Sequence, residues 1–174
     1  VVENLLSITR LNDGRLKFKF TDELIDEVIA EALRHVSRKH EEHKIITDCE
    51  ELLLVHMDVR LILQVLINLV DNAIKYTPEG STIRVSAKKE NKYVKISVED
   101  DGPGIPDEMK PHIFEMFYTG KNTIADSHRS LGLGLALCRS IVEVHDGKLV
   151  IEDHKPHGCI FSFTLPLSEV VLNE

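Results

Sequence analysis

The sequence lacks the features that mark membrane-spanning and secreted chains. No stretch approaches the roughly 20 apolar residues of a membrane span, and no basic segment followed by an apolar run indicates a signal peptide. The three cysteines, Cys49, Cys138 and Cys159, are far apart, odd in number and without a C-x-x-C pair. This pattern argues against a disulfide framework and a zinc site, so we expect a soluble chain in a reducing, cytosolic setting.

Positive charge is also scarce. The chain has 21 Lys and Arg residues against 29 Asp and Glu residues, which gives a formal net charge of −8. Such a balance argues against nucleic acid or an anionic membrane as the primary partner, and a phosphate site would have to use local backbone donors. What is present is sufficient for one α/β domain with a buried core, because 43% of the 174 residues are hydrophobic.

The hydrophobic pattern predicts helices and hairpins in mixed order. Residues 1–11 indicate the end of an amphipathic helix, and we expect a separate domain to begin near residue 14. The expected strands are 15–20, 45–46, 52–55, 82–88, 93–99, 148–152 and 159–165, and the expected helices are 21–36, 59–75, 107–117 and 132–144, with Thr21 and Asp58 as N-caps. This order favours a two-layer α+β sandwich over a doubly wound sheet.

One predicted helix carries a polar stripe beside its apolar one. Asn68, Asn72, Lys75 and Tyr76 lie at positions i, i+4, i+7 and i+8. Two carboxamides buried without partners would cost about 1–3 kcal/mol each. We therefore expect both to face a ligand, a metal or a water-filled cleft, and two solvent-facing Asn residues on an exposed helix edge are the alternative.

Two glycine-containing segments follow. Asp100-Asp101-Gly102-Pro103-Gly104 ends a predicted strand, where the glycines would let the backbone approach a planar ligand and a carboxylate could accept a hydrogen bond. A tight Pro-Gly turn is the alternative. Gly132 and Gly134 lie where a loop enters a helix, a position whose free N–H groups and dipole favour phosphate; glycines needed only for close packing are the alternative. Neither segment has a Rossmann or P-loop signature.

In their order and spacing, these segments resemble the catalytic, ATP-binding domain of sensor histidine kinases. The matching motifs are an N box at 68–76, a first Gly box at 100–104, an F box at 113–117, a second Gly box at 132–135 and a closing strand motif at 158–166. The resemblance covers about residues 15–167. It implies a Bergerat-type sandwich, with a mixed sheet covered on one face by helices and a mobile ATP lid at about 118–131. It also implies that residues 1–13 are the C-terminal tail of a dimerisation helix and that residues 14–174 form the catalytic domain.

The resemblance implies an adenine site after the first predicted hairpin. Asp100 would accept a hydrogen bond from the adenine amino group, and Gly102 and Gly104 would shape the wall beside the ring. Ile105 and Phe117 would also contact the nucleotide.

The phosphate side of the site is implied by the N box and the second Gly box. Asn72 would hold Mg²⁺ with Asn68 near it, Lys75 would neutralise phosphate charge and Tyr76 would line the nucleotide. The amides around Gly132, Leu133 and Gly134 would contact the phosphates. Oxygen ligands suit Mg²⁺, and phosphoryl transfer depends on positioning and charge neutralisation.

The chain departs from the family pattern at three places. Asn68 occupies the position where ATP-hydrolysing relatives such as gyrase have a catalytic Glu, so we expect slow hydrolysis. Thr119 stands where many of the kinases have an Arg, with Lys121 or Arg129 as candidate substitutes, and Ser130-Leu131 stands where a further Gly is usual. A nucleotide-binding regulatory module without efficient transfer is therefore an alternative function.

The acceptor of the phosphoryl group is missing from the sequence. None of the nine histidines lies in the His-Glu/Asp-x-x-x-Pro context of a phosphoacceptor, so we expect a fragment whose acceptor histidine is on a separate dimerisation domain, with a response regulator as the next partner. Residues 2–11 and 137–145 are most similar to the potassium-responsive Kdp sensor kinases, which implies a membrane-anchored homodimeric parent with this domain in the cytoplasm. An anti-sigma-factor-type serine kinase is a further alternative, against which the helical tail argues.

Two histidine pairs could in principle bind a metal. They are His40 and His43, and His154 and His157, and for both we favour a solvated surface. Cys138 and Cys159 are interpreted as core residues.

Overall fold

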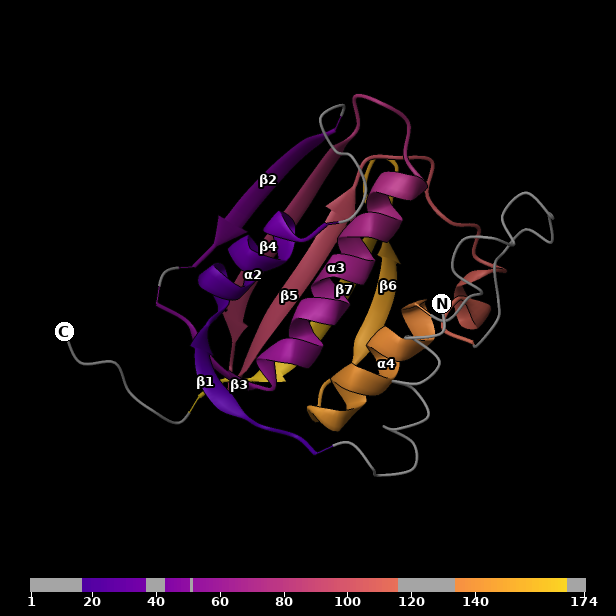
Figure 1. The fold of residues 1–174 in the computed structure, drawn as a ribbon. Coiled ribbons are helices and arrows are strands. Elements are labelled where there is room, and N and C mark those ends of the chain that lie inside the picture. The colour runs from indigo at the N-terminus through magenta and orange to yellow at the C-terminus, as the bar shows by residue number, and fades with distance from the viewer. Residues whose placement is uncertain (1–16, 37–42, 51, 116–133, 169–174) are drawn as a thin grey trace.

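The computed structural model describes residues 17–36, 43–50, 52–115 and 134–168. Five strands form a mixed sheet in the order β2-β4-β5-β7-β6, in which only the β2–β4 pair is parallel, and β1 pairs with β3 in a separate two-stranded sheet. The helices α2, α3 and α4 lie on one face of the larger sheet (Figure 1). The predicted two-layer α+β sandwich is thereby confirmed.

The elements begin and end close to most of the predicted bounds. They are β1 (Thr21–Leu24), α2 (Ile25–Arg34), β2 (Lys44–Cys49), β3 (Leu54–Met57), α3 (Val59–Lys75), β4 (Thr82–Glu90), β5 (Tyr93–Asp100), the 3₁₀ helix η1 (Lys110–His112), α4 (Gly134–Val144), β6 (Leu149–Asp153) and β7 (Cys159–Pro166). Among the described helices, none is both long enough and apolar enough to cross a bilayer.

The core lies between the sheet and the helices. β5 turns Val94, Ile96 and Val98 toward α3, whose buried stripe includes Leu66 and Leu69. Each such side chain contributes about 1.5–3 kcal/mol when it is removed from water. Because α3 and β5 run in the same direction across this core, the end of α3 and the end of β5 lie at the same edge of the molecule (Figure 1).

The strand predicted over 15–20 is wrong at its described residues, 17–20. Residues 17–20 belong to no strand, because their backbone bonds to side chains: the Lys19 N–H donates to Asp58 Oδ2 at 2.9 Å and Arg60 Nη2 donates to the Lys17 carbonyl at 3.3 Å. The strand is instead Thr21–Leu24, which pairs with β3, and this pairing delays the helix from Thr21 to Ile25. Long-range pairing has overridden the local capping signal.

Two further local predictions need correction. Asp58 is the N-cap residue of α3 as predicted, but its side chain makes no capping hydrogen bond. A helix is expected over 107–117, but its described residues, 107–115, form turns and the 3₁₀ helix η1, in which Pro111 lacks the N–H that a longer helix would use. The predicted helical tail at 1–11 and the predicted lid at 118–131 lie outside the described residues.

Candidate functional site

The site is built around a carboxylate at the end of β5. Asp100 is only 9% exposed, and its Oδ1 accepts hydrogen bonds from the N–H groups of Gly102 at 3.0 Å and Cys159 at 3.3 Å. Within the described part of the chain, Oδ2 has no hydrogen-bond partner. Burial raises the pKa of Asp100, and the two backbone N–H groups oppose this shift. The carboxylate is therefore held by one oxygen while the other can accept a hydrogen bond from a ligand.

The loop that follows Asp100 packs too closely for larger residues. A Cβ added to Gly102 would lie 2.5 Å from Cγ2 of Thr77, the second residue after α3. Gly104 has a φ of +82°, a conformation that other residues rarely adopt. A Cβ on Gly158, in the turn between β6 and β7, would lie 1.9 Å from the Asp100 carbonyl oxygen. The loop is thus enclosed between the end of α3 and the β6–β7 turn.

The end of α3 forms the other side of the site. Asn68 and Asn72 are half-buried, and the side chain of Asn68 contacts the buried thiol of Cys138 in α4. The Lys75 ammonium lies 4.8 Å from the centre of the Tyr76 ring, a cation–π contact, and Tyr76 is 51% exposed. The polar stripe of α3 is therefore half-open to solvent.

Comparisons with known proteins give this arrangement a family. The sequence pattern of the "histidine kinase-, DNA gyrase B-, and HSP90-like ATPase" family matches residues 57–169. The chain belongs to this ATPase family. Sensor protein KdpD of Clostridium acetobutylicum is 43% identical over 167 residues, which cover 95% of this chain and 19% of KdpD. The chain therefore spans about a fifth of the length of this relative.

Solved structures of histidine kinases share the fold of this ATPase domain. The nucleotide-free catalytic domain of histidine kinase ThkA is 35% identical, with a TM-score of 0.75 over 86% of this chain and 98% of that domain. ThkA in complex with response regulator TrrA aligns with a TM-score of 0.76 and 30% identity over 96% of this chain and 48% of that chain. The predicted Bergerat-type catalytic domain of a histidine kinase is confirmed.

The structure of the ATPase domain brings two of the predicted motifs together. The close approach of Gly102 to Thr77 joins the first Gly box directly to the end of the N box. Ile105, packed against the core, continues the loop that begins at Asp100. Gly134 is the first residue of α4, and a Cβ there would meet nothing within 4 Å. The other predicted contacts, Phe117, Gly132 and Leu133, lie outside the described residues, as does Thr119.

Sequence reasoning missed several residues that hold this site. Thr77 Oγ1 donates to the Ala73 carbonyl at 2.7 Å and lies 2.9 Å from Nε2 of His43. Cys159, interpreted as a core residue, is 3% exposed as predicted, but its backbone N–H also holds the Asp100 carboxylate. The position of Cys159 at the start of the closing strand motif was the one signal in the sequence that could have linked it to the site.

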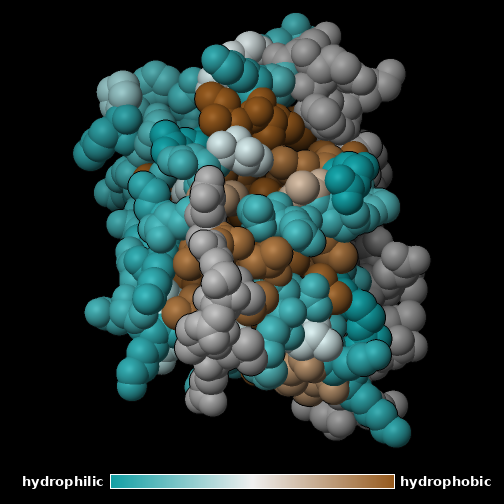
Figure 2. Space-filling model, turned by 90° about the vertical axis from the view of Figure 1, so that its left-hand side faces the viewer, coloured by the Kyte–Doolittle hydropathy of each residue, from teal (hydrophilic) through white to brown (hydrophobic). Residues whose placement is uncertain are grey.

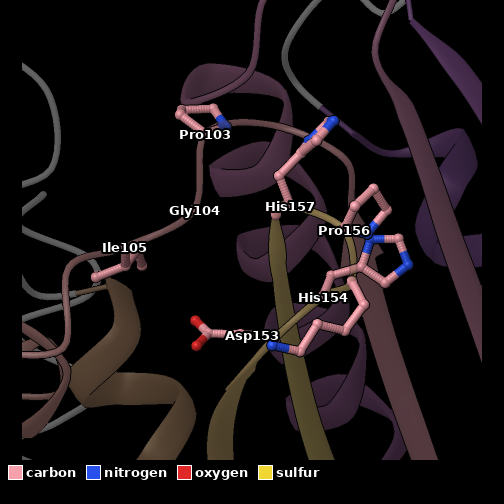
Figure 3. A pocket seen from close by; sticks show the side chains of 9 residues that line it. Pro103, Gly104, Ile105, Asp153, His154, Pro156 and His157 are labelled. Carbon is pink, nitrogen blue, oxygen red and sulfur yellow. The ribbon is translucent and has the colours of Figure 1, made fainter.

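Metal binding by the histidine pairs finds no support in the described residues. No group of three or more His, Cys, Asp or Glu side chains in that part of the chain could hold a metal ion. His40 lies outside it. His154 is half-buried, whereas His157 is exposed and its Nδ1 lies 3.1 Å from the Gly102 carbonyl oxygen. This turn and the Pro103–Ile105 segment together line a pocket of about 220 Å³ (Figure 3).

Proposed function

We propose that this chain binds Mg²⁺-ATP and delivers the γ-phosphoryl group to a histidine on a dimerisation domain outside the sequence. The imidazole nitrogen forms the new bond to phosphorus, the bond to the β-phosphate oxygen breaks, and ADP leaves. The observation that carries this proposal is the buried Asp100 carboxylate, which keeps one oxygen for a ligand at the edge where α3 ends. Membership of the ATPase family and the likeness to histidine kinase catalytic domains support it.

The adenine part of the site uses fixed geometry. Asp100 Oδ2 accepts a hydrogen bond from the adenine amino group, and Gly102, without a side chain, lets the loop pack closely against Thr77 and form a wall beside the ring. Ile105 and Phe117 add apolar contact. Because the carboxylate is already held by two backbone N–H groups, nucleotide binding need not order it.

The phosphate part uses charge and oxygen ligands. Asn72 offers a carboxamide oxygen to Mg²⁺, with Asn68 near it, and Mg²⁺ supplies neutralisation of the triphosphate charge. Lys75 adds a positive charge, Tyr76 lines the nucleotide, and the amides around Gly132, Leu133 and Gly134 bind the phosphates at the start of α4. Asn68 in place of a general base keeps transfer to water slow.

The partners follow from the same proposal. Residues 1–13 are the end of a dimerisation helix, residues 118–131 are the ATP lid, and a response regulator receives the phosphoryl group from the histidine. ThkA, solved with response regulator TrrA, supports the last step. The likeness to KdpD supports a membrane-anchored, homodimeric parent that responds to potassium, with this domain in the cytoplasm.

Calorimetric titration of this chain with ATP, with and without Mg²⁺, tests the proposal. We expect Asp100→Asn to weaken binding by roughly tenfold or more. Glu99→Gln is the matched control, because Glu99 is the preceding residue of β5 and its side chain points to the other face of the sheet. Unchanged affinity in the Asp100→Asn variant, with the same melting temperature, would remove the adenine assignment.

A further inference from the structure

The turn between β6 and β7 touches the Asp100–Gly104 loop at three points. The Cys159 N–H donates to Asp100 Oδ1 at 3.3 Å, Gly158 packs its Cα against the Asp100 carbonyl, and His157 Nδ1 lies 3.1 Å from the Gly102 carbonyl oxygen. These residues are 55 to 59 positions apart in the sequence. The turn is therefore part of the wall of the nucleotide site, although the ATP-binding motifs do not include its histidine.

The residue that His157 contacts, Gly102, is itself one of those that hold the Asp100 carboxylate. Glycine has the greatest backbone freedom of any residue type. The N–H of Gly102 is one of the two groups that hold the Asp100 carboxylate. Its carbonyl is an acceptor only, so the imidazole must carry its proton on Nδ1 and donate it. Gly102 is thus fixed on both sides, by Asp100 through its N–H and by His157 through its carbonyl.

We propose that His157 is a positioning residue of the nucleotide site: its Nδ1–H fixes the Gly102 peptide, so that Asp100 keeps Oδ2 directed at the adenine amino group. This inference rests on the proposed function. His157 need not contact the nucleotide, because it acts through Gly102. Without the imidazole, part of the free energy of binding is spent on ordering the loop, which weakens affinity without changing the groups that touch ATP.

The neighbouring histidine of the same turn provides a comparison. The side chains of His154 and His157 point in different directions (Figure 3). The His154 Nε2 lies 3.8 Å from Glu99 Oε2. Among the described residues, its Nδ1 has no hydrogen-bond partner, and its side chain makes no bond to the Asp100–Gly104 loop. Replacing His154 changes the same turn without touching the proposed contact.

The experiment compares two nucleotides across four variants. Binding of ATP and of inosine triphosphate, which has a carbonyl oxygen in place of the amino group, is measured by displacement of a fluorescent ATP analogue. We expect His157→Ala to weaken ATP binding by about fivefold and inosine triphosphate binding by less than twofold. We expect His157→Asn, whose Nδ2 can replace Nδ1 as donor, to restore ATP affinity to within about twofold, and His154→Ala to match the wild type.

The outcomes separate this inference from the function on which it rests. Equal losses for both nucleotides, equal effects of Ala and Asn, or unchanged ATP affinity in His157→Ala would overturn the positioning role. Asp100→Asn, the fourth variant, reports on the function itself: if Asp100→Asn weakens ATP binding and His157→Ala does not, only the positioning role fails. If Asp100→Asn binds ATP as the wild type does, the adenine assignment fails as well. Melting temperatures within about 2 °C of the wild type show that the variants are folded.

Discussion

His145, at the end of α4, accepts a hydrogen bond on Nε2 from the backbone N–H of Asp58, the N-cap residue of α3, at 3.0 Å. Its Nδ1 donates to the Ile141 carbonyl at 2.8 Å, so both ring nitrogens are used and the imidazole is neutral. The ring is only 3% exposed, and burial lowers its pKa. The Ile141 carbonyl and the nearby Asp58 carboxylate favour the charged ring, but burial, aided by His56, outweighs them.

Asp58 also holds residues 17–20 against the domain, through its carboxylate. Asp58 is 1% exposed, and its carboxylate accepts hydrogen bonds from the Lys19 N–H and from Arg60, which outweigh burial and lower its pKa. Phe20 stacks on His56 with 5.4 Å between ring centres and meets His145 edge-on at 5.2 Å. The segment that leads into the domain is therefore held by one buried polar cluster and one aromatic cluster.

Acid should weaken the domain through His145 first. Above a pH of about 6.5, His145 is neutral in both folded and unfolded chains; below it, the unfolded chain binds a proton that the folded chain resists, so stability falls. Asp58, whose pKa is lowered, adds a further loss below a pH of about 4. Urea unfolding between pH 7.5 and 4 measures this slope.

The variant His145→Gln isolates this effect, because a glutamine oxygen can accept the Asp58 N–H but does not titrate. We expect its stability to change less than that of the wild type between pH 7 and 5. Parallel slopes in the two proteins would assign the acid sensitivity to other groups.

Gly158→Ala should unfold the domain or deform the wall of the nucleotide site that the β6–β7 turn forms. The added Cβ would lie 1.9 Å from the Asp100 carbonyl oxygen, and the φ of +119° is strained for alanine. We expect a loss of about 3 kcal/mol or more in the free energy of unfolding. Gly134→Ala is the control, since a Cβ there meets nothing within 4 Å and alanine favours helices. Chemical denaturation measures the free energy of unfolding of both variants. Similar losses in the two would mean that the close packing of Gly158 against Asp100 does not contribute to stability.

Asn72→Ala should separate magnesium binding from adenine binding. We expect the increase in ATP affinity on addition of Mg²⁺ to shrink roughly tenfold, while affinity without Mg²⁺ stays near the wild-type value. Gln64→Ala, on the exposed side of the same helix, should leave both values unchanged. Calorimetry in Mg²⁺ and in EDTA makes the comparison, and a normal Mg²⁺ response in Asn72→Ala would contradict the proposed ligand.

The three cysteines should differ in reactivity toward a thiol reagent at pH 8. Burial raises the pKa of Cys138 to about 12 and that of Cys159 to about 11, so neither offers an accessible thiolate. Cys49 is only partly buried and should react first, although burial raises its pKa as well. Mass spectrometry after brief labelling should find one modified thiol in the folded protein, on Cys49. Rapid labelling of Cys159 would show that the part of the site around Asp100 and Cys159 opens transiently to solvent.

The sequence predicted well those parts of the fold that repeat a local pattern. The stripe of α3 and the alternation of β4 and β5 are strong, so their bounds lie within about two residues of the predicted ones, and Asp100 lies at the end of its strand as expected. The strand predicted over 15–20 failed because the real strand depends on a distant partner. β1 starts at Thr21 because it pairs with β3, some thirty residues later, and nothing in the local alternation of residues 15–20 indicates that pairing.

The candidate site shows the same division. Glycines and a carboxylate at a strand end are visible in the sequence, since their spacing is local. The bond between His157 and Gly102 arises only when segments far apart in the chain meet. The same holds away from the site for the hydrophobic surface that lies among polar residues on the face shown in Figure 2. His157 sits in a turn whose composition is typical of solvated surface, so no pattern within the turn distinguishes it.

The side chain of Asp100, at the end of β5, is bonded to the first residue of β7, Cys159, although 59 positions separate them. In topological terms, everything between them is an insertion into one antiparallel pair. The entropy of closing such a loop grows only with the logarithm of its length, about 0.6 kcal/mol for each doubling. Adding or removing several residues within this connection thus changes the closure entropy by only a small fraction of a kcal/mol. What keeps the carboxylate in place is the packing of Gly102, His157 and Gly158 around it.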